Sequence, residues 1–387
     1  MADHIPFVYT DRDCQVLRRF YPDSVAVRLS LQSVSEIASN VPAGLLRWID
    51  PGIDGLHKWP KVTDNYKNYL KTFPGFEQIG DPNFQRKPNK TVVDGFVTAA
   101  LDACKLFAPD WLSVPLLPLV GDSSRNKVNR QLAESAKKWK FERNFTGKLI
   151  LPVIFTHQTQ IKGRTERARQ LRLVEQCYQR SGADGIWVVE SSLSDQEGSQ
   201  PLERRFKAVI DFQQELLQNI PRDAILIGGP YWGLNLILWA RTVVRYPAIG
   251  LGSAYQYYLP GGVQMRAKKR VAIPPIRRWA VASPGLQSWL RRALKQLPQD
   301  DNAHTQIAEI ERNFDQLRIA GRAQVARFYK EWFDSLSTVP AAGRALALYQ
   351  DLSSAYVVGT SLPDLPPDEG AGRRPYRVAK QLMVNCL

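Results

Sequence analysis

The chain has 387 residues, 44% of them hydrophobic, which is enough for one large α/β domain with an appendage or for two domains. Lys and Arg number 52 against 37 Asp and Glu, and the resulting net charge of +15 favours a polyanionic partner, nucleic acid before a membrane surface. No apolar run reaches the length of a membrane span, and the first residues lack the apolar core of a secretion signal. The four scattered cysteines show no metal-ligand spacing, so we expect a cytoplasmic protein without a disulfide framework.

Short apolar runs that end in polar or small residues predict the strands, and amphipathic segments between them predict the helices. The first two strands are expected at 24–31 and 43–50, followed by an irregular, Lys- and Pro-rich insertion and a helix at 91–107. The later strands are expected at 111–120, 148–156, 185–189, 224–228 and 248–252. The helices between them are expected at 125–141, 163–181, 201–218 and 234–244.

This alternation of strands and helices is typical of a parallel sheet. Seven strand candidates precede residue 255, and 270–276 can supply an eighth, so we predict a (β/α)8 barrel with insertions and a helical C-terminal extension. A doubly wound open sheet is the alternative, but the chain has neither a G-x-G-x-x-G after a strand nor a Walker loop. The barrel is expected over 1–280 with an insertion at about 60–107, and the helical extension over 281–387, with a flexible tail at 361–374.

Polar or small residues stand at the carboxyl ends of the predicted strands, where enzymes with this fold place their catalytic groups. Each could also serve as a helix cap or a turn residue. Neither His57 nor His157 has a second His or Cys close in sequence, and no G-x-S-x-G occurs, so we expect no metal and no serine nucleophile. The candidate residues are Asp50, Asp54, Asp122, Gln158, Glu190, Gly228, Gly229 and Tyr255.

Basic segments at 125–140, 164–172 and 266–278 are candidates for contacts with a nucleic-acid backbone. The cations expected to make these contacts are Arg164, Arg167, Lys268, Lys269 and Arg270.

The motif Ile49-Asp50-Pro51-Gly52, the strand before Asp122 and the run from Ile154 to Gln158 follow one another in a recognisable order. Over roughly residues 24–280, this order resembles the queuine and archaeosine tRNA-guanine transglycosylases and their DNA-modifying relatives. That family forms (β/α)8 barrels that exchange guanine in nucleic acid for a 7-deazaguanine. The resemblance implies that Asp50 is an acid/base aspartate. It also implies that Asp122, Gln158 and the segment 185–190 contact the base.

The chain departs from the family in two ways. It lacks the Cys-x-Cys-x-x-Cys…His zinc site, and no Asp stands near Gly252 or Ser253, where the family has its nucleophile. Either Asp50 or Asp54 therefore attacks the sugar, or the exchange mechanism differs, or the protein only binds. The motifs Gly-Pro-Tyr-Trp and Tyr-Gln-Tyr-Tyr-Leu-Pro-Gly-Gly look more like the DNA-modifying branch.

We therefore expect a base-exchanging pentosyltransferase without a cofactor, in which Asp50 and Asp54 are catalytic. Its expected partners are DNA, favoured over tRNA, and a free 7-deazaguanine base of the 7-cyano-7-deazaguanine type. Three alternatives stay open: a catalytically silent nucleic-acid-binding barrel subunit, a tRNA-directed transglycosylase, and a hydrolase of a small or glycosidic substrate. An association with partner subunits also stays open.

Overall fold

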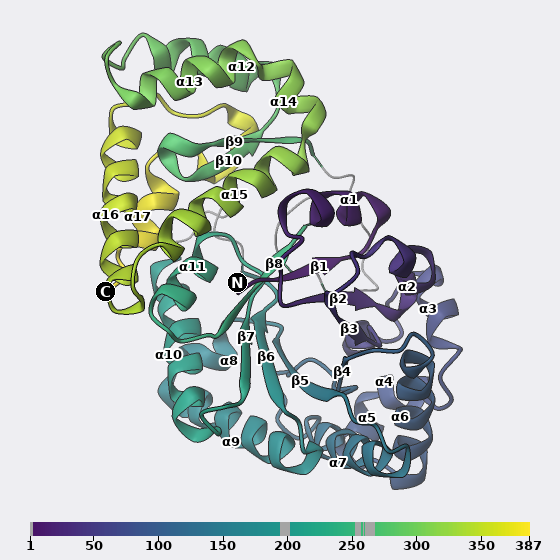
Figure 1. The fold of residues 1–387 in the computed structure, drawn as a ribbon. Helices are drawn as coiled ribbons and strands as arrows, with labels where there is room; N and C mark the ends of the chain where they lie inside the picture. Colours follow the sequence, from purple (N-terminus) through teal and green to yellow (C-terminus); the bar gives the residue numbers. More distant parts are fainter. Residues whose placement is uncertain (1–2, 194–201, 252–256, 258, 260–267) are drawn as a thin grey trace.

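Eight parallel strands close into a barrel in which β1 pairs with both β2 and β8, confirming the predicted (β/α)8 fold (Figure 1). The structure is a computed structural model and describes residues 3–193, 202–251, 257, 259 and 268–387. The strands of the barrel are β1 (Ile5–Val8), β2 (Ala26–Ser30), β3 (Leu46–Asp50), β4 (Trp111–Ser113), β5 (Lys148–Phe155), β6 (Gly185–Glu190), β7 (Ile225–Gly228) and β8 (Tyr246–Gly250).

Helices surround the barrel and bury apolar side chains against the strands. In α6, for example, Val93, Phe96, Val97 and Ala100 are all fully buried. The surrounding helices are α1 (Asp11–Phe20), α2 (Leu31–Ile37), α6 (Lys90–Lys105), α7 (Lys127–Glu142), α9 (Arg164–Ser181), α10 (Glu203–Asn219) and α11 (Gly233–Ala240), with the short α8 (Thr159–Lys162) before α9. None of the helices in the described ranges is long and apolar enough to cross a bilayer.

The prediction of the eighth strand at 270–276 is wrong. The barrel closes through β1, whereas β9 (Arg270–Ile273) pairs antiparallel with β10 (Arg278–Val281) in a separate sheet. All four residues of β1, Ile-Pro-Phe-Val, are buried, so this strand shows no alternation of polar and apolar residues. Because the strand is short and contains a proline, sequence patterns typical of strands do not predict it.

The predicted strand 111–120 is regular only over β4. Pro115 and Pro118 follow, and neither can donate a backbone hydrogen bond to a neighbouring strand. Pairing resumes at a single point, where Leu119 forms an isolated bridge with Phe155 of β5. The chain from 114 to 126 is therefore a long loop at the carboxyl end of the barrel.

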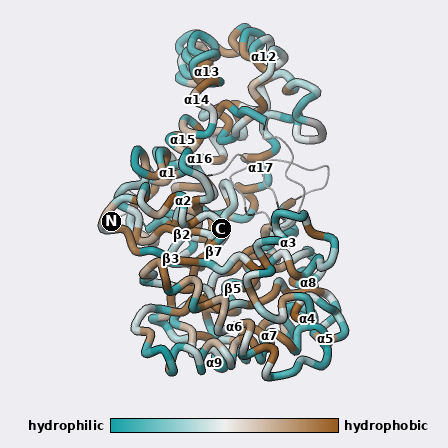
Figure 2. The backbone as a smooth tube through the Cα atoms, turned by 90° about the vertical axis from the view of Figure 1, so that its right-hand side faces the viewer, coloured by the Kyte–Doolittle hydropathy of each residue, from teal (hydrophilic) through white to brown (hydrophobic). Residues whose placement is uncertain are grey.

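The insertion after β3 is smaller than predicted and ends before α6. Helix α6 belongs to the outer ring of the barrel, because its Asp94 and Asp102 bond to Lys138 and Trp139 of the neighbouring helix α7. The insertion itself consists of η2 (Asp54–Lys58), α3 (Asp64–Leu70), α4 (Phe76–Gly80) and α5 (Pro82–Arg86). In Figure 2, α3, α5 and α8 lie on one side of the barrel, and the N-terminus lies on the other.

The C-terminal region starts earlier than the predicted residue 281. The hairpin of β9 and β10 shares a second apolar core with the helices that follow it, including Val271, Ile273, Trp289 and Ile307. The tail at 361–374 packs against the same region, where Leu365 is fully buried. The C-terminal helices are α12 (Pro284–Leu294), α13 (Asn302–Arg312), α14 (Phe314–Ala320), α15 (Arg322–Ser337), α16 (Ala341–Thr360) and α17 (Arg377–Met383).

Aromatic contacts join α15 to the barrel, and Figure 1 shows this helix between the barrel and the rest of the C-terminal region. The ring of Phe333 lies 3.7 Å from His4, just before β1, and 4.3 Å from Trp239 of α11. Trp232 lies 5.3 Å from Tyr329. The hydroxyl of Tyr21 donates to the Ala326 carbonyl at 2.8 Å. The C-terminal helices are thus packed against the barrel through buried rings.

Candidate active site at the carboxyl ends of the strands

Asp50, the first candidate carboxylate, ends β3 inside the barrel and is 2% exposed. Its Oδ1 accepts a hydrogen bond from the backbone N–H of Gly52 at 2.6 Å, and its Oδ2 accepts one from the Ser113 hydroxyl at 2.5 Å. The indole N–H of Trp48 donates to Ser113 at 2.9 Å and so orients that hydroxyl. Gly52 has a φ of 63°, a left-handed conformation that glycine adopts without strain. The strand end and the turn after it therefore fix the position of the carboxylate.

Arg28, in the middle of β2, forms a buried ion pair with Asp50. Its Nη2 lies 3.1 Å from Asp50 Oδ2, and its Nη1 donates to the Tyr9 hydroxyl at 3.2 Å. The guanidinium also lies within cation–π distance of five rings: Phe7, Tyr9, Trp48, Trp187 and Tyr257. Burial lowers the pKa of Arg28, but the negative charge of Asp50 and the nearby tyrosines outweigh burial and raise it overall. The guanidinium is therefore charged.

Asp54, the second candidate carboxylate, begins η2 and is also 2% exposed. Burial, together with the negative charge of Asp50, raises its pKa to about 7, although Arg28 and a hydrogen bond from the Tyr257 hydroxyl act in the opposite direction. A large fraction of Asp54 is therefore protonated near neutral pH, while Asp50 lies in an ion pair. Two carboxyl groups whose environments differ in this way are suited to separate acid and base roles.

The insertion holds the loop between the two carboxylates. The Tyr66 hydroxyl of α3 accepts from the backbone N–H of Gly55 at 3.1 Å and donates to the Gly52 carbonyl at 2.6 Å. His57 Nδ1 lies 2.7 Å from the carbonyl oxygen of Asp54, and burial lowers the pKa of this histidine to about 4. The neutral imidazole therefore contributes a hydrogen bond to the loop and no charge.

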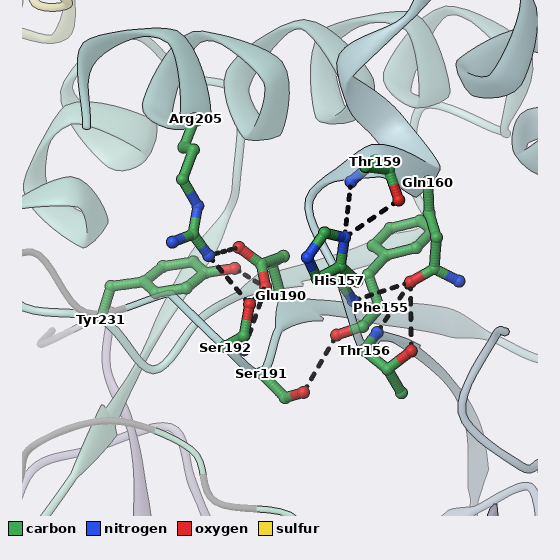
Figure 3. A network of polar contacts seen from close by, with 10 residues as sticks. All are labelled: Phe155, Thr156, His157, Thr159, Gln160, Glu190, Ser191, Ser192, Arg205 and Tyr231. Carbon is green, nitrogen blue, oxygen red and sulfur yellow. Dashed lines mark hydrogen bonds and ion pairs between the residues drawn. The ribbon is translucent and has the colours of Figure 1, made fainter. Parts of the chain in front are cut away.

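A separate polar network lies at the ends of β5 and β6 (Figure 3). Glu190 ends β6, is 2% exposed and forms an ion pair with Arg205 of α10. The backbone N–H of Glu190 donates to the Tyr231 hydroxyl at 2.6 Å, and its side chain accepts from the backbone N–H of Ser192 at 3.0 Å. The carboxylate predicted to contact a base is therefore tied to Arg205 and Ser192.

Gln160, rather than the predicted Gln158, is the glutamine built into this network. Its Oε1 accepts from the backbone N–H groups of Thr156 and His157, each at 2.9 Å, and its Nε2 donates to the Leu119 carbonyl at 2.6 Å. Gln158 is half-buried and does not cap α8 with its side chain. Of the two, Gln158 is the glutamine whose amide is available to a ligand.

Asp122 lies apart from the buried pair, in the long loop after β4. It is exposed, and its carboxylate accepts from Arg86 of the insertion at 2.9 Å and from the backbone N–H of Ser124 at 3.0 Å. Hydrogen bonds from Ser124 and Arg86 lower its pKa to about 2. The structure therefore places Asp122 as a link between the loop and the insertion, at the same end of the barrel as Asp50.

The two glycines at the end of β7 are enclosed by protein atoms. A Cβ at Gly228 would lie 2.8 Å from Val244 and 3.1 Å from Gln213, and Gly229 has a φ of 90°. The carbonyl of Gly229 accepts from the Trp187 indole at 2.6 Å. These glycines allow close packing and a tight turn. The remaining predicted base contact, Tyr255, lies outside the described residues.

The predicted backbone cations fall into two groups. Arg164, Lys268 and Lys269 are exposed, as phosphate contacts require. Arg270 is 9% exposed with its guanidinium 4.1 Å from the Trp279 ring centroid. Arg167 pairs with Glu215 at 2.8 Å. Arg270 and Arg167 are thus engaged within the protein.

The sequence-based prediction missed Arg28, Ser113, Tyr66 and Tyr257. Arg28 carried a usable signal, because a lone charge inside the apolar run Ser-Val-Ala-Val-Arg-Leu-Ser-Leu calls for a buried partner of opposite charge. No such signal marks the other three, since a serine or a tyrosine in a strand or helix is common.

The fold and the site together define a (β/α)8 barrel with a buried Arg28–Asp50–Asp54 cluster at the carboxyl ends of its strands. Within the ranges that the structure describes, no three His, Cys, Asp or Glu side chains gather in a way that could hold a metal ion. A surface pocket of about 370 Å³ lies elsewhere, between α7 and α9, and its Arg130, Gln176, Gln179 and Arg180 offer no acid or nucleophile. The sequence matches no protein-family model and no curated protein.

Proposed function

We propose that the protein exchanges guanine in DNA for a 7-deazaguanine base. The observation that carries this proposal is the pair Asp50 and Asp54, two adjacent buried carboxyl groups of which one is ion-paired and the other has a pKa of about 7. Base exchange at a glycosidic bond requires one carboxylate to stabilise or attack the anomeric carbon and one group to transfer a proton. The pair can supply both functions.

In the proposed reaction, the Asp50 carboxylate forms a bond to C1′ of the nucleotide as the C1′–N9 bond of guanine breaks. Protonated Asp54 donates its proton to the departing purine. The incoming 7-deazaguanine then gives its own proton to Asp54, and its ring nitrogen displaces Asp50 from C1′. Protons and electron pairs balance without a metal or a redox partner, and the base must leave the helical stack before this can happen.

The net charge of +15 supports a nucleic-acid substrate, since phosphate contacts by Lys and Arg release counterions and dominate affinity. The choice of DNA over tRNA rests on the resemblance of the Gly-Pro-Tyr-Trp motif to the DNA-modifying branch. Gln158 is the side-chain amide best placed to read the edge of the base, because it is accessible and lies at the end of β5.

A catalytically silent nucleic-acid-binding subunit is the second candidate, and one observation favours it. Both oxygens of Asp50 already have protein partners, namely Gly52, Ser113 and Arg28, and the carboxylate is 2% exposed. A nucleophile must exchange at least one of these partners for the sugar. In the silent subunit, the same bonds would serve only to stabilise the barrel.

The incorporation of labelled guanine into polymer distinguishes these candidates. The wild type, D50N and D54N are incubated with radiolabelled guanine and either plasmid DNA or tRNA, and DNA binding is measured in parallel. We expect incorporation into DNA by the wild type alone, with binding retained by both variants. Binding without incorporation by the wild type would support the silent subunit, and incorporation into tRNA alone would support the tRNA-directed enzyme. Unchanged incorporation by D50N would refute the assignment of Asp50.

A further inference from the structure

The insertion after β3 carries an excess of positive charge at the mouth of the barrel. Residues 54–89 contain six Lys and Arg and four Asp and Glu, a net charge of 6 − 4 = +2. One of the four acids, Asp54, is buried and has a raised pKa. The exposed face of the insertion is therefore more basic than its composition indicates.

Lys58 and Lys61 stand at the tip of a loop that is well anchored. Between them, Trp59 packs against Phe76 with ring centroids 5.1 Å apart, and a Cβ on Gly80 would lie 2.6 Å from the Trp59 side chain. The backbone N–H of Lys61 donates to the Lys58 carbonyl at 2.8 Å. Both lysines are exposed, and neither forms an ion pair within the described part of the chain.

The loop after β5 adds two more exposed cations, Lys162 and Arg164, at the same end of the barrel. Figure 2 shows α3 of the insertion and α8, which ends at Lys162, on the same side of the molecule. Several exposed acids of these loops already have cationic partners: Asp64 pairs with Lys67, Asp122 with Arg86 and Glu166 with Arg169.

The opposite end of the barrel has a different charge pattern. An aspartate stands one to three residues before five of the strands: Asp3 before β1, Asp23 before β2, Asp110 before β4, Asp184 before β6 and Asp223 before β7. Arg47, Lys148, Arg222 and Arg245 stand at or close to the starts of β3, β5, β7 and β8, so this end of the barrel carries charges of both signs.

We propose that Lys58 and Lys61 at the tip of the insertion, together with Lys162 and Arg164, bind the phosphodiester backbone of the nucleic acid on either side of the reacting nucleotide. This proposal rests on the proposed function for the identity of the polyanion and extends it to a defined surface. Phosphate contacts of this kind position the substrate and are independent of its sequence. Because Trp59 anchors the tip against Phe76, less backbone entropy is lost when the two lysines engage phosphates.

The test compares two double variants that remove the same charge from opposite ends of the barrel. K58Q/K61Q neutralises the tip of the insertion, and K148Q/R222Q neutralises two exposed cations next to the starts of β5 and β7. Binding of a fluorescently labelled DNA duplex, and separately of tRNA, is measured by anisotropy from 50 to 200 mM salt. Circular dichroism checks that all variants are folded.

We expect K58Q/K61Q to weaken binding by about 10- to 100-fold at 100 mM salt and to reduce the slope of log K against log salt by about 2. K148Q/R222Q should change affinity by less than about 2-fold, as expected for charges that touch no phosphate. Equal losses in the two double variants, no loss in K58Q/K61Q, or a wild type that binds neither polymer would overturn the proposal. Salt-dependent binding without base exchange would refute the proposed function but would still support the proposed binding surface.

Discussion

Three residues separate Asp50 from Asp54, and their neighbours give the two carboxyl groups different environments. Arg28 lies 3.1 Å from Asp50, whereas Asp54 receives a hydrogen bond from a tyrosine, Tyr257. A buried carboxyl group that lacks a dedicated cation takes up a proton at higher pH, because burial penalises its charged form. The acid and base roles proposed for the two carboxyl groups thus follow from which of them Arg28 contacts.

The raised pKa of Asp54 predicts that this residue makes the fold less stable as the pH rises. Its pKa is about 7 in the folded protein and about 3.8 ordinarily, so its contribution is complete below pH 4 and is lost as the pH increases toward 7. Within that window, each pH unit changes the free energy of unfolding by up to about 1.4 kcal/mol. Urea unfolding at pH 4.5 and 7.0 should show a smaller loss of stability with rising pH in D54N. Identical losses in wild type and variant would contradict the assigned pKa.

Removing Arg28 should be costly because it leaves Asp50 buried without its cation. We expect R28M to lose about 3–5 kcal/mol of unfolding free energy, as for other broken buried ion pairs. Adding D50N to R28M should restore part of the loss, since an amide needs no counterion. R86M, which breaks the half-exposed pair with Asp122, is the matched control and should have a much smaller effect. Urea unfolding measures all four proteins. A double variant less stable than R28M would rule out the charge-pair explanation.

At the scale of elements, the strands predicted correctly from the sequence are those whose apolar runs end at a polar or small residue. The strand from Gly185 to Glu190 agrees with its prediction to within one residue. β1 was not predicted because four buried residues that include a proline show no periodic pattern. β4 was predicted too long because the apolar run continues past the strand, where Pro115 and Pro118 interrupt the pairing. The carboxylates of the site were predicted because strand ends are readable from sequence. Arg28 was missed although its charge inside an apolar run indicated a buried partner, and Tyr257 was missed because its contact with Asp54 becomes visible only in the folded chain.

The close pairing of β6 and β7 at Gly185 gives a prediction about packing. A Cβ there would lie 2.6 Å from the carbonyl oxygen of Ile225 and 2.5 Å from its Cβ, so the strands would have to move apart. We expect G185A to lose about 1–3 kcal/mol of unfolding free energy, the usual cost of overpacking. G121A is the control, because no atom lies within 4 Å of the added methyl, and it should change stability by less than about 0.5 kcal/mol. Thermal denaturation of both variants makes the comparison, and equal melting temperatures would refute it.

At the scale of the whole molecule, the barrel and the C-terminal helices depend on one another through a buried aromatic contact. His4 precedes β1, is fully buried, and lies against Phe333 of α15. Neither ring nitrogen of His4 has a hydrogen-bond partner in the described part of the chain. Burial, with a smaller effect of Lys330, holds the pKa of His4 well below its usual value of about 6.5.

This contact predicts that the protein loses stability in mild acid. The unfolded chain binds a proton at His4 below pH 6.5 and the folded chain does not, so stability is complete above that pH and falls below it. The H4F variant keeps a ring against Phe333. We expect its melting temperature to fall less than that of the wild type when the pH is lowered from 7.5 to 5.0. This direction is opposite to that of Asp54, so the H4F and D54N variants separate the two effects. An H4F variant as acid-sensitive as the wild type would exclude His4 as the cause.

Nucleoside mass spectrometry tests the central claim most directly. Purified protein is incubated with plasmid DNA and 7-cyano-7-deazaguanine, the DNA is digested to nucleosides, and D50N is treated in parallel. We predict a 7-deazaguanine deoxynucleoside, with release of free guanine, in the wild-type sample and neither product with D50N. DNA that is bound by the wild type but contains no deazaguanine nucleoside, while free guanine is absent from the supernatant, would contradict the account.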